Sequence, residues 1–364
     1  MNSESELTRN LPPRYYTEPK ILEREREGAL SSTWQYAGHE SQIPECGDFF
    51  TFEIAGQGLF CVRDSERKIH AFFNVCQHRA HELVTGAGNK RVIVCPYHAW
   101  TYNLDGQLRY GRNLSSVPGL DISKICLTSV KLENFHGFLF VNLDSEARSM
   151  KEWYPNVHEE IREFVPQIDR LKLFRVEKLV ENCNWKLSVE NYSECYHCPI
   201  NHKAFSNGII KPETYDIRPQ GYCLRHTTEC QNLDKMSYPI NLEANATAGK
   251  YSSWYLWPMF SFQVYPGNIL NTYCWREIDV DHVEVQRGWY TVDGEDSEVI
   301  DALADQDLQT TVAEDIRLVE SVQRGMRNRG YRPGPLVVDP KGGVHSEHSI
   351  EVLQEWMRAG TQTQ

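Results

Sequence analysis

The sequence lacks any run of about 18 apolar residues, so it predicts no membrane-spanning helix. Residues 1–10, MNSESELTRN, have neither the basic nor the apolar segment of a secretory signal. The eleven cysteines are odd in number and have no regular spacing, which indicates free and metal-bound thiols in a reducing compartment, the cytoplasm. Lys and Arg number only 38 against 50 Asp and Glu, and the net charge of −12 argues against nucleic acid as a partner.

Two short clusters of metal-ligating side chains are present instead. Cys76 and His78 form the first, and Cys95 and His98 form the second after a gap of sixteen residues. Each cluster offers one sulfur and one imidazole, whereas structural zinc sites usually use a Cys-x-x-Cys knuckle or group both Cys and both His. A Rieske [2Fe–2S] centre needs two Cys on one iron and two His on the other. The spacing therefore favours a Rieske centre, with a zinc site or unrelated Cys and His as alternatives.

The length of 364 residues allows two domains, each with its own core. Residues 1–35 predict an extended arm with three prolines, followed by a short helix that packs with the second domain. Residues 36–145 contain short β-branched and aromatic runs bounded by Gly, Asp or Asn, which predict a small antiparallel β domain carrying the two clusters. The polar stretch near residues 145–155 is the expected boundary.

Residues 146–364 predict a second domain in which strands and helices are separate, so the chain is α+β. Alternating apolar runs between residues 214 and 293 predict one large antiparallel sheet, with Pro258 and Pro266 at edges or bulges. The flanking helices are expected over 150–165, 184–198, 297–330 and 347–358.

A second cluster begins near residue 190. Asn191, Glu194 and His197 are spaced three apart, which places them along one side of the helix expected over 184–198. Pro199 disfavours helix before it and should turn the chain, so that His202 converges with His197. Two imidazoles and one carboxylate with open positions are typical of a non-haem Fe(II) site. The alternative is that both histidines are ordinary polar residues.

The carboxylate has to come from elsewhere in the chain. Residues 310–326 predict a helix with an apolar stripe of Val312, Val319 and Val322, and Asp315 falls on that stripe. A buried carboxylate is costly without a partner, and a metal ion is a sufficient one.

The neighbouring acidic side chains have a different position on this helix. Glu314 and Glu320 fall further from the stripe and are predicted to be solvated. The alternative role for Asp315 is an ion pair with Arg317 or Arg324. Periodicity alone leaves both roles open.

Three motifs together resemble one family. Residues 95–102, CPYHAWTY, residues 191–202, NYSECYHCPINH, and the distant Asp315 resemble the oxygenase (α) component of Rieske non-haem iron oxygenases. The first cluster departs from the family pattern at Gln77 and Ala80, where Ala stands in a turn that favours Gly. Glu194 replaces the usual Asp, as in the carnitine monooxygenase oxygenase subunits and related quaternary ammonium (betaine) demethylases. The resemblance covers nearly the whole chain.

The resemblance implies a [2Fe–2S] cluster, a mononuclear Fe(II) and a homotrimer. It also implies O2-dependent hydroxylation of a C–H bond beside a quaternary ammonium nitrogen, as in carnitine or a betaine, followed by C–N cleavage. Glu194 would connect His98 of the partner subunit to His197, and a separate flavin and iron–sulfur reductase would supply electrons from NAD(P)H. Cation–π contacts to the substrate are expected from Tyr192, Trp254, Tyr255 and Trp257. The alternatives are an oxygenase for an aromatic substrate and a pure electron-transfer protein.

Overall fold

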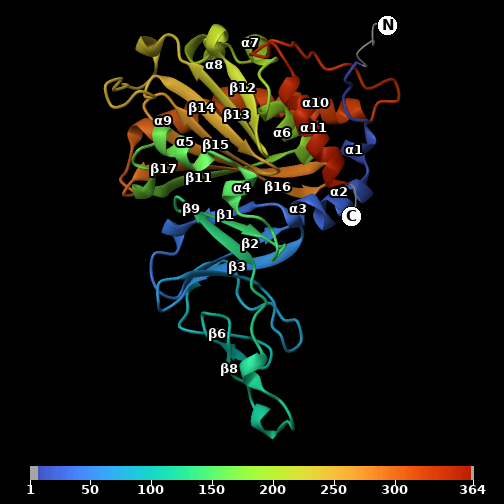
Figure 1. Cartoon of the computed structure of the whole chain (residues 1–364), viewed down its shortest axis with the longest axis vertical. Coiled ribbons are helices and arrows are strands. Elements are labelled where there is room, and N and C mark those ends of the chain that lie inside the picture. The colour runs from blue at the N-terminus through green and yellow to red at the C-terminus, as the bar shows by residue number, and fades with distance from the viewer. Residues whose placement is uncertain (1–6, 362–364) are drawn as a thin grey trace. The chain divides into compact units, whose positions relative to one another are not determined.

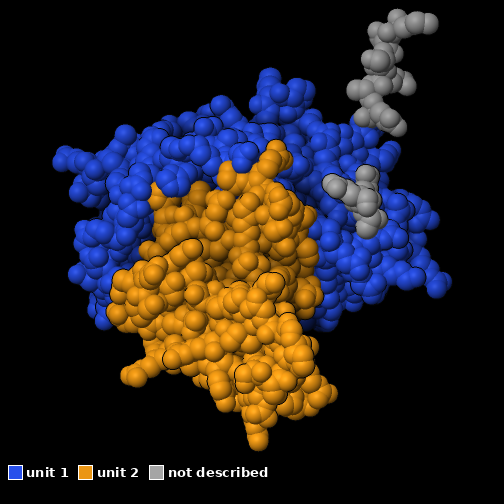
Figure 2. Space-filling model, turned by 60° about the horizontal axis from the view of Figure 1, so that its bottom comes forward, with its two compact units in different colours: residues 1–29, 150–364 blue, residues 30–149 orange. Residues whose placement is uncertain are grey.

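The computed structural model describes residues 7–361. The chain divides into two compact units, Met1–Ala29 with Met150–Gln364 and Leu30–Ser149 (Figure 1 and Figure 2). Within residues 7–361, no helix is both long and apolar enough to cross a membrane. Each unit is described separately below.

The smaller unit consists of short antiparallel strands, as the sequence predicts. They form sheets in the orders β1-β10-β9, β4-β3-β2-β5 and β6-β7-β8. The strands are β1 (Gln35–His39), β2 (Asp48–Ile54), β3 (Gln57–Arg63), β4 (Ile69–Phe73), β5 (Ala87–Asn89), β6 (Ile93–Val94), β7 (Thr101–Tyr102), β8 (Leu108–Tyr110), β9 (Lys131–Phe135) and β10 (Phe138–Asn142). Single helical turns are η1 (Glu40–Gln42), η2 (Leu114–Ser116) and η3 (Ile122–Lys124).

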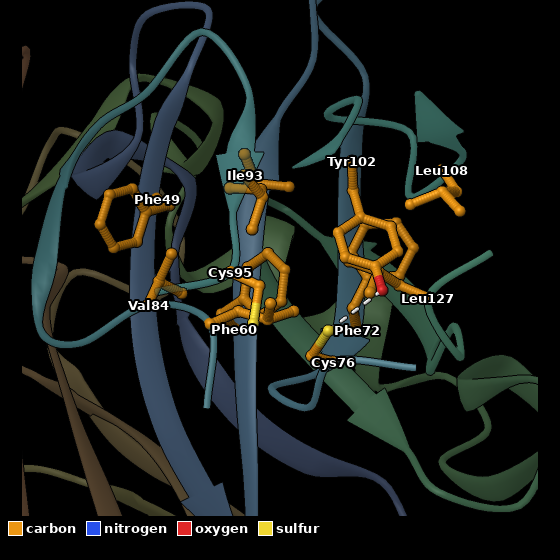
Figure 3. Close-up of a cluster of buried hydrophobic side chains, with 12 residues drawn as sticks. Phe49, Phe60, Phe72, Cys76, Val84, Ile93, Cys95, Tyr102, Leu108 and Leu127 are labelled. Carbon is orange, nitrogen blue, oxygen red and sulfur yellow. Dashed lines mark hydrogen bonds between the residues drawn. The ribbon is translucent and has the colours of Figure 1, made fainter. Parts of the chain in front are cut away.

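The core of this unit contains both cluster cysteines. Phe60 and Phe72 project from β3 and β4 toward Cys76 and Cys95, and the ring of Tyr102 from β7 completes the group (Figure 3). Burying these aromatic side chains contributes roughly 1.5–3 kcal/mol each. The two cysteine loops are therefore fixed at their base by the apolar core.

The larger unit is built on one seven-stranded antiparallel sheet in the order β11-β17-β16-β15-β14-β13-β12. Its strands are β11 (Leu171–Glu181), β12 (Asp216–Gln220), β13 (Cys223–Glu229), β14 (Lys250–Leu256), β15 (Phe260–Tyr265), β16 (Ile269–Asp279) and β17 (His282–Val292). This confirms the predicted large sheet. The edge strand β11 was not predicted, because its charged residues interrupt the apolar pattern. Pro258 and Pro266 lie in the turns that follow β14 and β15.

Helices α6, α10 and α11 gather beside this sheet (Figure 1). The helices are α1 (Arg14–Thr17), α2 (Pro19–Glu27), α3 (Ala29–Ser32), α4 (Met150–Trp153), α5 (Val157–Phe164), α6 (Trp185–Tyr192), α7 (Cys198–Asn201), α8 (Lys203–Gly208), α9 (Glu298–Asp307), α10 (Ala313–Met326) and α11 (His348–Gly360). The turns η4 (Ile168–Arg170), η5 (Pro212–Thr214) and η6 (Leu233–Lys235) and the π-helical turn η7 (Leu308–Val312) connect them. The prediction of an extended N-terminal arm is wrong at α1, which is helical. Residues 1–6 of that arm lie outside the described residues.

A buried charged pair joins the N-terminal segment to α6. Lys186 is fully buried, and its Nζ lies 2.8 Å from the carboxylate of Glu25 on α2. The indole Nε1 of Trp185 donates to the same carboxylate at 3.0 Å. One turn further along α6, Glu190 accepts the hydroxyl of Tyr16 at 2.7 Å. These contacts fix the helix that leads into the second histidine cluster.

Candidate metal centres and cavity

The two cysteine loops of the smaller unit have the same backbone geometry. In each loop the cysteine amide donates to a carbonyl five residues further on, at 2.9 Å for Cys76 and 2.8 Å for Cys95. Ala80 and Ala99 occupy the fourth position after these cysteines with φ of 55° and 56°, and each donates its amide back to the cysteine carbonyl at 3.0 Å. Ala80 therefore adopts a positive φ that favours Gly, which is the turn strain expected at a position where the family has Gly.

The side chains of these loops fit one [2Fe–2S] cluster. Cys76 and Cys95 are both 2% exposed, whereas the rings of His78 and His98 lie nearer the loop tips, 4.6 Å apart between centroids. The ring of Trp100 stacks on His78 at 4.6 Å. Two buried sulfurs and two adjacent imidazoles are the donor set of a Rieske centre.

A tyrosine hydroxyl lies directly against one of these sulfurs. Tyr102 is fully buried, and its oxygen is 3.3 Å from Cys76 Sγ (Figure 3). The same oxygen accepts the amide of Gln77 at 3.1 Å. When Cys76 is a cluster thiolate, the hydroxyl is the donor of this pair and its proton points toward the sulfur.

The second cluster brings three donor atoms together in the larger unit. His197 Nε2 and His202 Nε2 are 3.0 Å apart, and Asp315 Oδ1 lies 2.9 Å from His202 Nε2 and 3.3 Å from His197 Nε2. Burial alone lowers the pKa of His197, but the Asp315 and Glu194 carboxylates outweigh it and raise that pKa to about 10. The arrangement attracts positive charge, and its two imidazoles and one carboxylate fit the facial triad of a non-haem iron.

Acidic side chains hold the outer nitrogens of both imidazoles. His197 Nδ1 contacts the carboxylate of Glu194, and His202 Nδ1 lies 2.8 Å from Glu314 Oε2. Such partners orient a metal-binding imidazole and raise its basicity. The predicted solvation of Glu314 is wrong, because the helix face adjacent to the valine stripe also faces His202.

The helix expected over 184–198 is shorter in the structure. Asn184 caps α6 by accepting the amide of Lys186 at 3.1 Å, and the helix ends at Tyr192. Glu194 and His197 lie in the turn beyond it, so they do not share a helix face with Asn191. Pro199 lies in the first turn of α7, and His202 follows that helix. The two histidines converge as expected, but Pro199 does not turn the chain, because Cys198 and Pro199 are both helical and the helix is interrupted at His202.

Asp315 lies on α10, directly after the π-helical turn η7. Val312 and Val319 are buried beside it, whereas Val322 is 43% exposed, so the predicted stripe is correct for two of its three residues. Glu320, predicted to be solvated, accepts the side-chain amide of Asn182 at 2.6 Å. Asp315 contacts the two histidines instead of forming the alternative ion pair with Arg317 or Arg324.

Two cysteines flank His197 and form a disulfide, Cys195–Cys198. This corrects the expectation of only free and metal-bound thiols. Cys198 Sγ, His197 and His202 also lie within 4.8 Å of one another. Because Cys195 already binds that sulfur, Asp315 is the better third ligand for a metal held by the two histidines.

A cavity opens beside the triad against one face of the large sheet. Seven of its lining residues are aromatic, and Tyr192 is among them as expected. The lining residues are Glu181, Ser188, Asn191, Tyr192, Glu194, Cys195, His197, Cys198, His202, Phe205, Tyr215, His226, Tyr251, Gln263, Tyr265, Tyr273, Trp275, Val285, Asp307, Thr311, Val312 and Asp315.

The other three aromatic residues predicted for the substrate lie outside this lining. Trp254 projects from the opposite face of β14 and donates to Glu160 Oε2 at 2.8 Å. The hydroxyl of Tyr255 bonds to a backbone carbonyl, and the ring of Trp257 lies 5.8 Å from that of Trp185. Trp254 is thus on the face away from the cavity, whereas Tyr255 shares the face of the lining residue Tyr273 but lies outside the lining.

Both units match known domains. Residues 33–121 match the Rieske [2Fe-2S] domain, and residues 168–363 match the ring hydroxylating alpha subunit (catalytic domain). The chain belongs to the Rieske ring-hydroxylating oxygenase α-subunit family. Members of this family combine a [2Fe–2S] cluster with a mononuclear iron, the two groups that the donor sets of both units fit.

This Rieske oxygenase resembles several enzymes that act on quaternary ammonium compounds. The carnitine monooxygenase oxygenase subunit of Escherichia coli (strain K12) is 33% identical over 344 residues, covering 93% of this chain and 90% of that protein. The chloroplastic choline monooxygenase of Beta vulgaris is 29% identical, covering 93% of this chain and 75% of that protein. A quaternary ammonium Rieske monooxygenase solved in complex with L-carnitine has a TM-score of 0.85 and 28% identity, covering 99% and 97% of the two chains.

Proposed function

We propose that this chain is the terminal oxygenase of a multi-component monooxygenase that hydroxylates a C–H bond beside a quaternary ammonium nitrogen. The hydroxylated carbon then carries both oxygen and nitrogen, so the C–N bond breaks to give an aldehyde and a free amine. The overall hydroxylation consumes O2, two electrons and two protons, and releases water. The relatives named for carnitine and choline support this substrate class.

The observation that carries the proposal is the aromatic wall next to the triad. The ring of Tyr192 lies 5.1 Å from those of Tyr273 and Trp275, and all three line the cavity. A trimethylammonium group donates no hydrogen bonds and is recognised by aromatic faces, each contact contributing roughly 0.5–2 kcal/mol. Aromatic rings also exclude water from the reacting carbon.

His197, His202 and Asp315 would hold the mononuclear iron, and Cys76, His78, Cys95 and His98 would hold the cluster. The bound iron would supply O2 activation, with electrons that the cluster relays. Glu194 and Glu314 keep the imidazole protons on the two Nδ1 atoms, so both Nε2 atoms remain free to bind metal. Asn191 Nδ2 lies 3.3 Å from His197 Nε2 and restrains that ring from the cavity side.

We further propose a homotrimer in which Glu194 accepts hydrogen bonds from His197 and from His98 of the partner subunit. Glu194 already lies against His197 Nδ1 and accepts the amide of that residue at 3.3 Å. A carboxylate can accept from two imidazoles at once. The electrons would come from a flavin and iron–sulfur reductase that uses NAD(P)H, in the cytoplasm, where thiols such as the nine free cysteines remain reduced.

A substrate screen tests this function. Iron-loaded protein is combined with a reductase and NADH, and O2 uptake and amine release are measured for carnitine, γ-butyrobetaine, glycine betaine, choline and proline betaine. We expect at least one compound to release its amine in proportion to O2 consumed. Coupled turnover of an aromatic acid, with none of the five compounds converted, would contradict the proposal.

A further inference from the structure

Four buried polar side chains form a row across the sheet face that borders the cavity. His226 pairs with Ser253, Ser253 with Gln263, and Gln263 with Asn271 in the register of β13, β14, β15 and β16. Directly opposite residues of antiparallel strands share one face. His226 and Gln263 line the cavity. The row thus forms a polar band that reaches the cavity at His226 and Gln263.

Several atoms of this band have no hydrogen-bond partner among the described residues. They are His226 Nε2, Gln263 Oε1, and both the Nδ2 and Oδ1 of Asn271. The three side chains are 3%, 5% and 0% exposed. Buried polar atoms are nearly always paired, so a concentration of unpaired ones facing a cavity marks a place where a ligand supplies the partner.

The hydrogen-bond partners that His226 and Gln263 already have determine which donor and acceptor atoms remain for a ligand. The hydroxyl of Tyr215 lies 3.0 Å from His226 Nδ1, and the amide nitrogen of Gln263 donates to the hydroxyl of Tyr251 at 2.7 Å. Burial lowers the pKa of His226 to about 3, so its ring is neutral at pH 7. In the tautomer in which Tyr215 donates to Nδ1, the ring proton is on Nε2. The band then presents a neutral donor at His226 and a neutral acceptor at Gln263.

The side-chain charges around the cavity disfavour an anionic ligand group. No described side chain of the lining is Lys or Arg, whereas Glu181, Glu194, Asp307 and Asp315 all contribute carboxyl groups. The nearby Arg287 is fully buried and already pairs with Asp307 and with Glu177. Away from the iron site, a substrate carboxylate would be buried without a cationic side chain and close to other negative charges.

We propose that His226 and Gln263 form the subsite for the polar end of the substrate, and that this subsite takes a neutral hydroxyl rather than a carboxylate. A hydroxyl both accepts from His226 Nε2 and donates to Gln263 Oε1, which a carboxylate cannot do. The inference rests on the proposed function and narrows its substrate class to quaternary ammonium alcohols such as choline.

The test compares three ligands that share the trimethylammonium group. Choline has the hydroxyl, ethyltrimethylammonium lacks it, and glycine betaine replaces it by a carboxylate. Binding to the iron-loaded protein is measured by calorimetry without a reductase, so no turnover occurs. We expect choline to bind at least about tenfold more tightly than either of the others, since a site built to bind a hydroxyl discriminates against an analogue without it.

Two variants and one control test whether His226 and Gln263 cause the preference for choline. His226→Phe and Gln263→Leu should each reduce the preference for choline over ethyltrimethylammonium to about twofold or less. The affinity for ethyltrimethylammonium should stay unchanged. Thr272→Val removes a buried hydroxyl from the opposite face of β16 and should keep the full preference. Circular dichroism and melting temperature establish that each variant is folded.

The ligand comparison in the wild-type protein is decisive without any variant. Equal affinity for choline and ethyltrimethylammonium, or tighter binding of glycine betaine, would overturn the hydroxyl subsite while the proposed function stands. A preference that persists in both variants would overturn the roles of His226 and Gln263. If none of the three ligands binds and no quaternary ammonium compound is oxidised, the proposed function itself is wrong.

Discussion

Replacing Tyr102 by Phe removes a single hydroxyl from the cluster environment and keeps the buried ring. That hydroxyl is 3.3 Å from Cys76 Sγ, and it is the donor of the pair when Cys76 is a cluster thiolate. An electron added to the cluster increases the negative charge on the thiolates, so this donor stabilises the reduced state more than the oxidised state. A difference of about 1 kcal/mol corresponds to roughly 40 mV for a one-electron couple. We expect Tyr102→Phe to lower the reduction potential by about that amount.

The assay is a redox titration monitored by the EPR signal of the reduced cluster. Tyr110→Phe is the matched control, because Tyr110 lies on the neighbouring strand and is 57% exposed. Tyr102→Phe also deprives the partly buried amide of Gln77 of its acceptor, which costs the loop about 1 kcal/mol. Tyr102→Phe should therefore lose iron to a chelator faster than the control does.

Two results would refute this reasoning. An unchanged potential in fully loaded Tyr102→Phe would show that the hydroxyl does not donate to the sulfur. An equal decrease in Tyr110→Phe would show that the effect is not local to Cys76. Integrated spin per protein must match between the variants, so that a partial loss of cluster is not read as a shift in potential.

Three further predictions concern the larger unit. In Glu194→Gln, single-turnover oxidation of the pre-reduced cluster should decrease while the cluster EPR signal and the iron content of both sites persist; normal turnover would exclude a role in electron transfer. Lys186→Met leaves Glu25 buried without a cation and should lower the free energy of unfolding in urea by about 3–5 kcal/mol. Adding Glu25→Gln in a double variant should restore most of that stability. A double variant as unstable as Lys186→Met alone would contradict the ion pair. His226 has a pKa of about 3 when folded and about 6.5 when unfolded. The free energy of unfolding should therefore decrease as pH falls below 6.5, by up to about 1.4 kcal/mol per pH unit. His226→Gln should flatten this pH dependence, and an identical slope in the variant would contradict the burial of His226.

Local sequence signals predicted the parts of the site that depend on short segments. Cys76, His78, Cys95 and His98 lie in two loops whose spacing favours a Rieske donor set over a zinc site. Asp315 was found by helical periodicity, because one valine-lined face of a regular helix has to be buried. These features require no knowledge of which distant segments meet.

Features that depend on tertiary contacts were predicted poorly. Glu314 lies beside Asp315 and was expected in solvent, but its contact with His202 joins residues 112 positions apart. Trp254 and Tyr273 are equally aromatic, and only strand parity and pairing decide which one faces the cavity. The early end of α6 at Tyr192 likewise depends on the turn that brings His197 to His202.

The most direct test of the central claim is a single turnover under O2 with a quaternary ammonium substrate. The cluster is reduced chemically, excess reductant is removed, and choline is added to the iron-loaded protein, with Asp315→Ala as the control. The account predicts that the wild-type protein releases trimethylamine as its cluster is oxidised, and that Asp315→Ala keeps the cluster signal but releases none. Cluster oxidation without amine release, from choline and from every other quaternary ammonium compound of the screen, would contradict it.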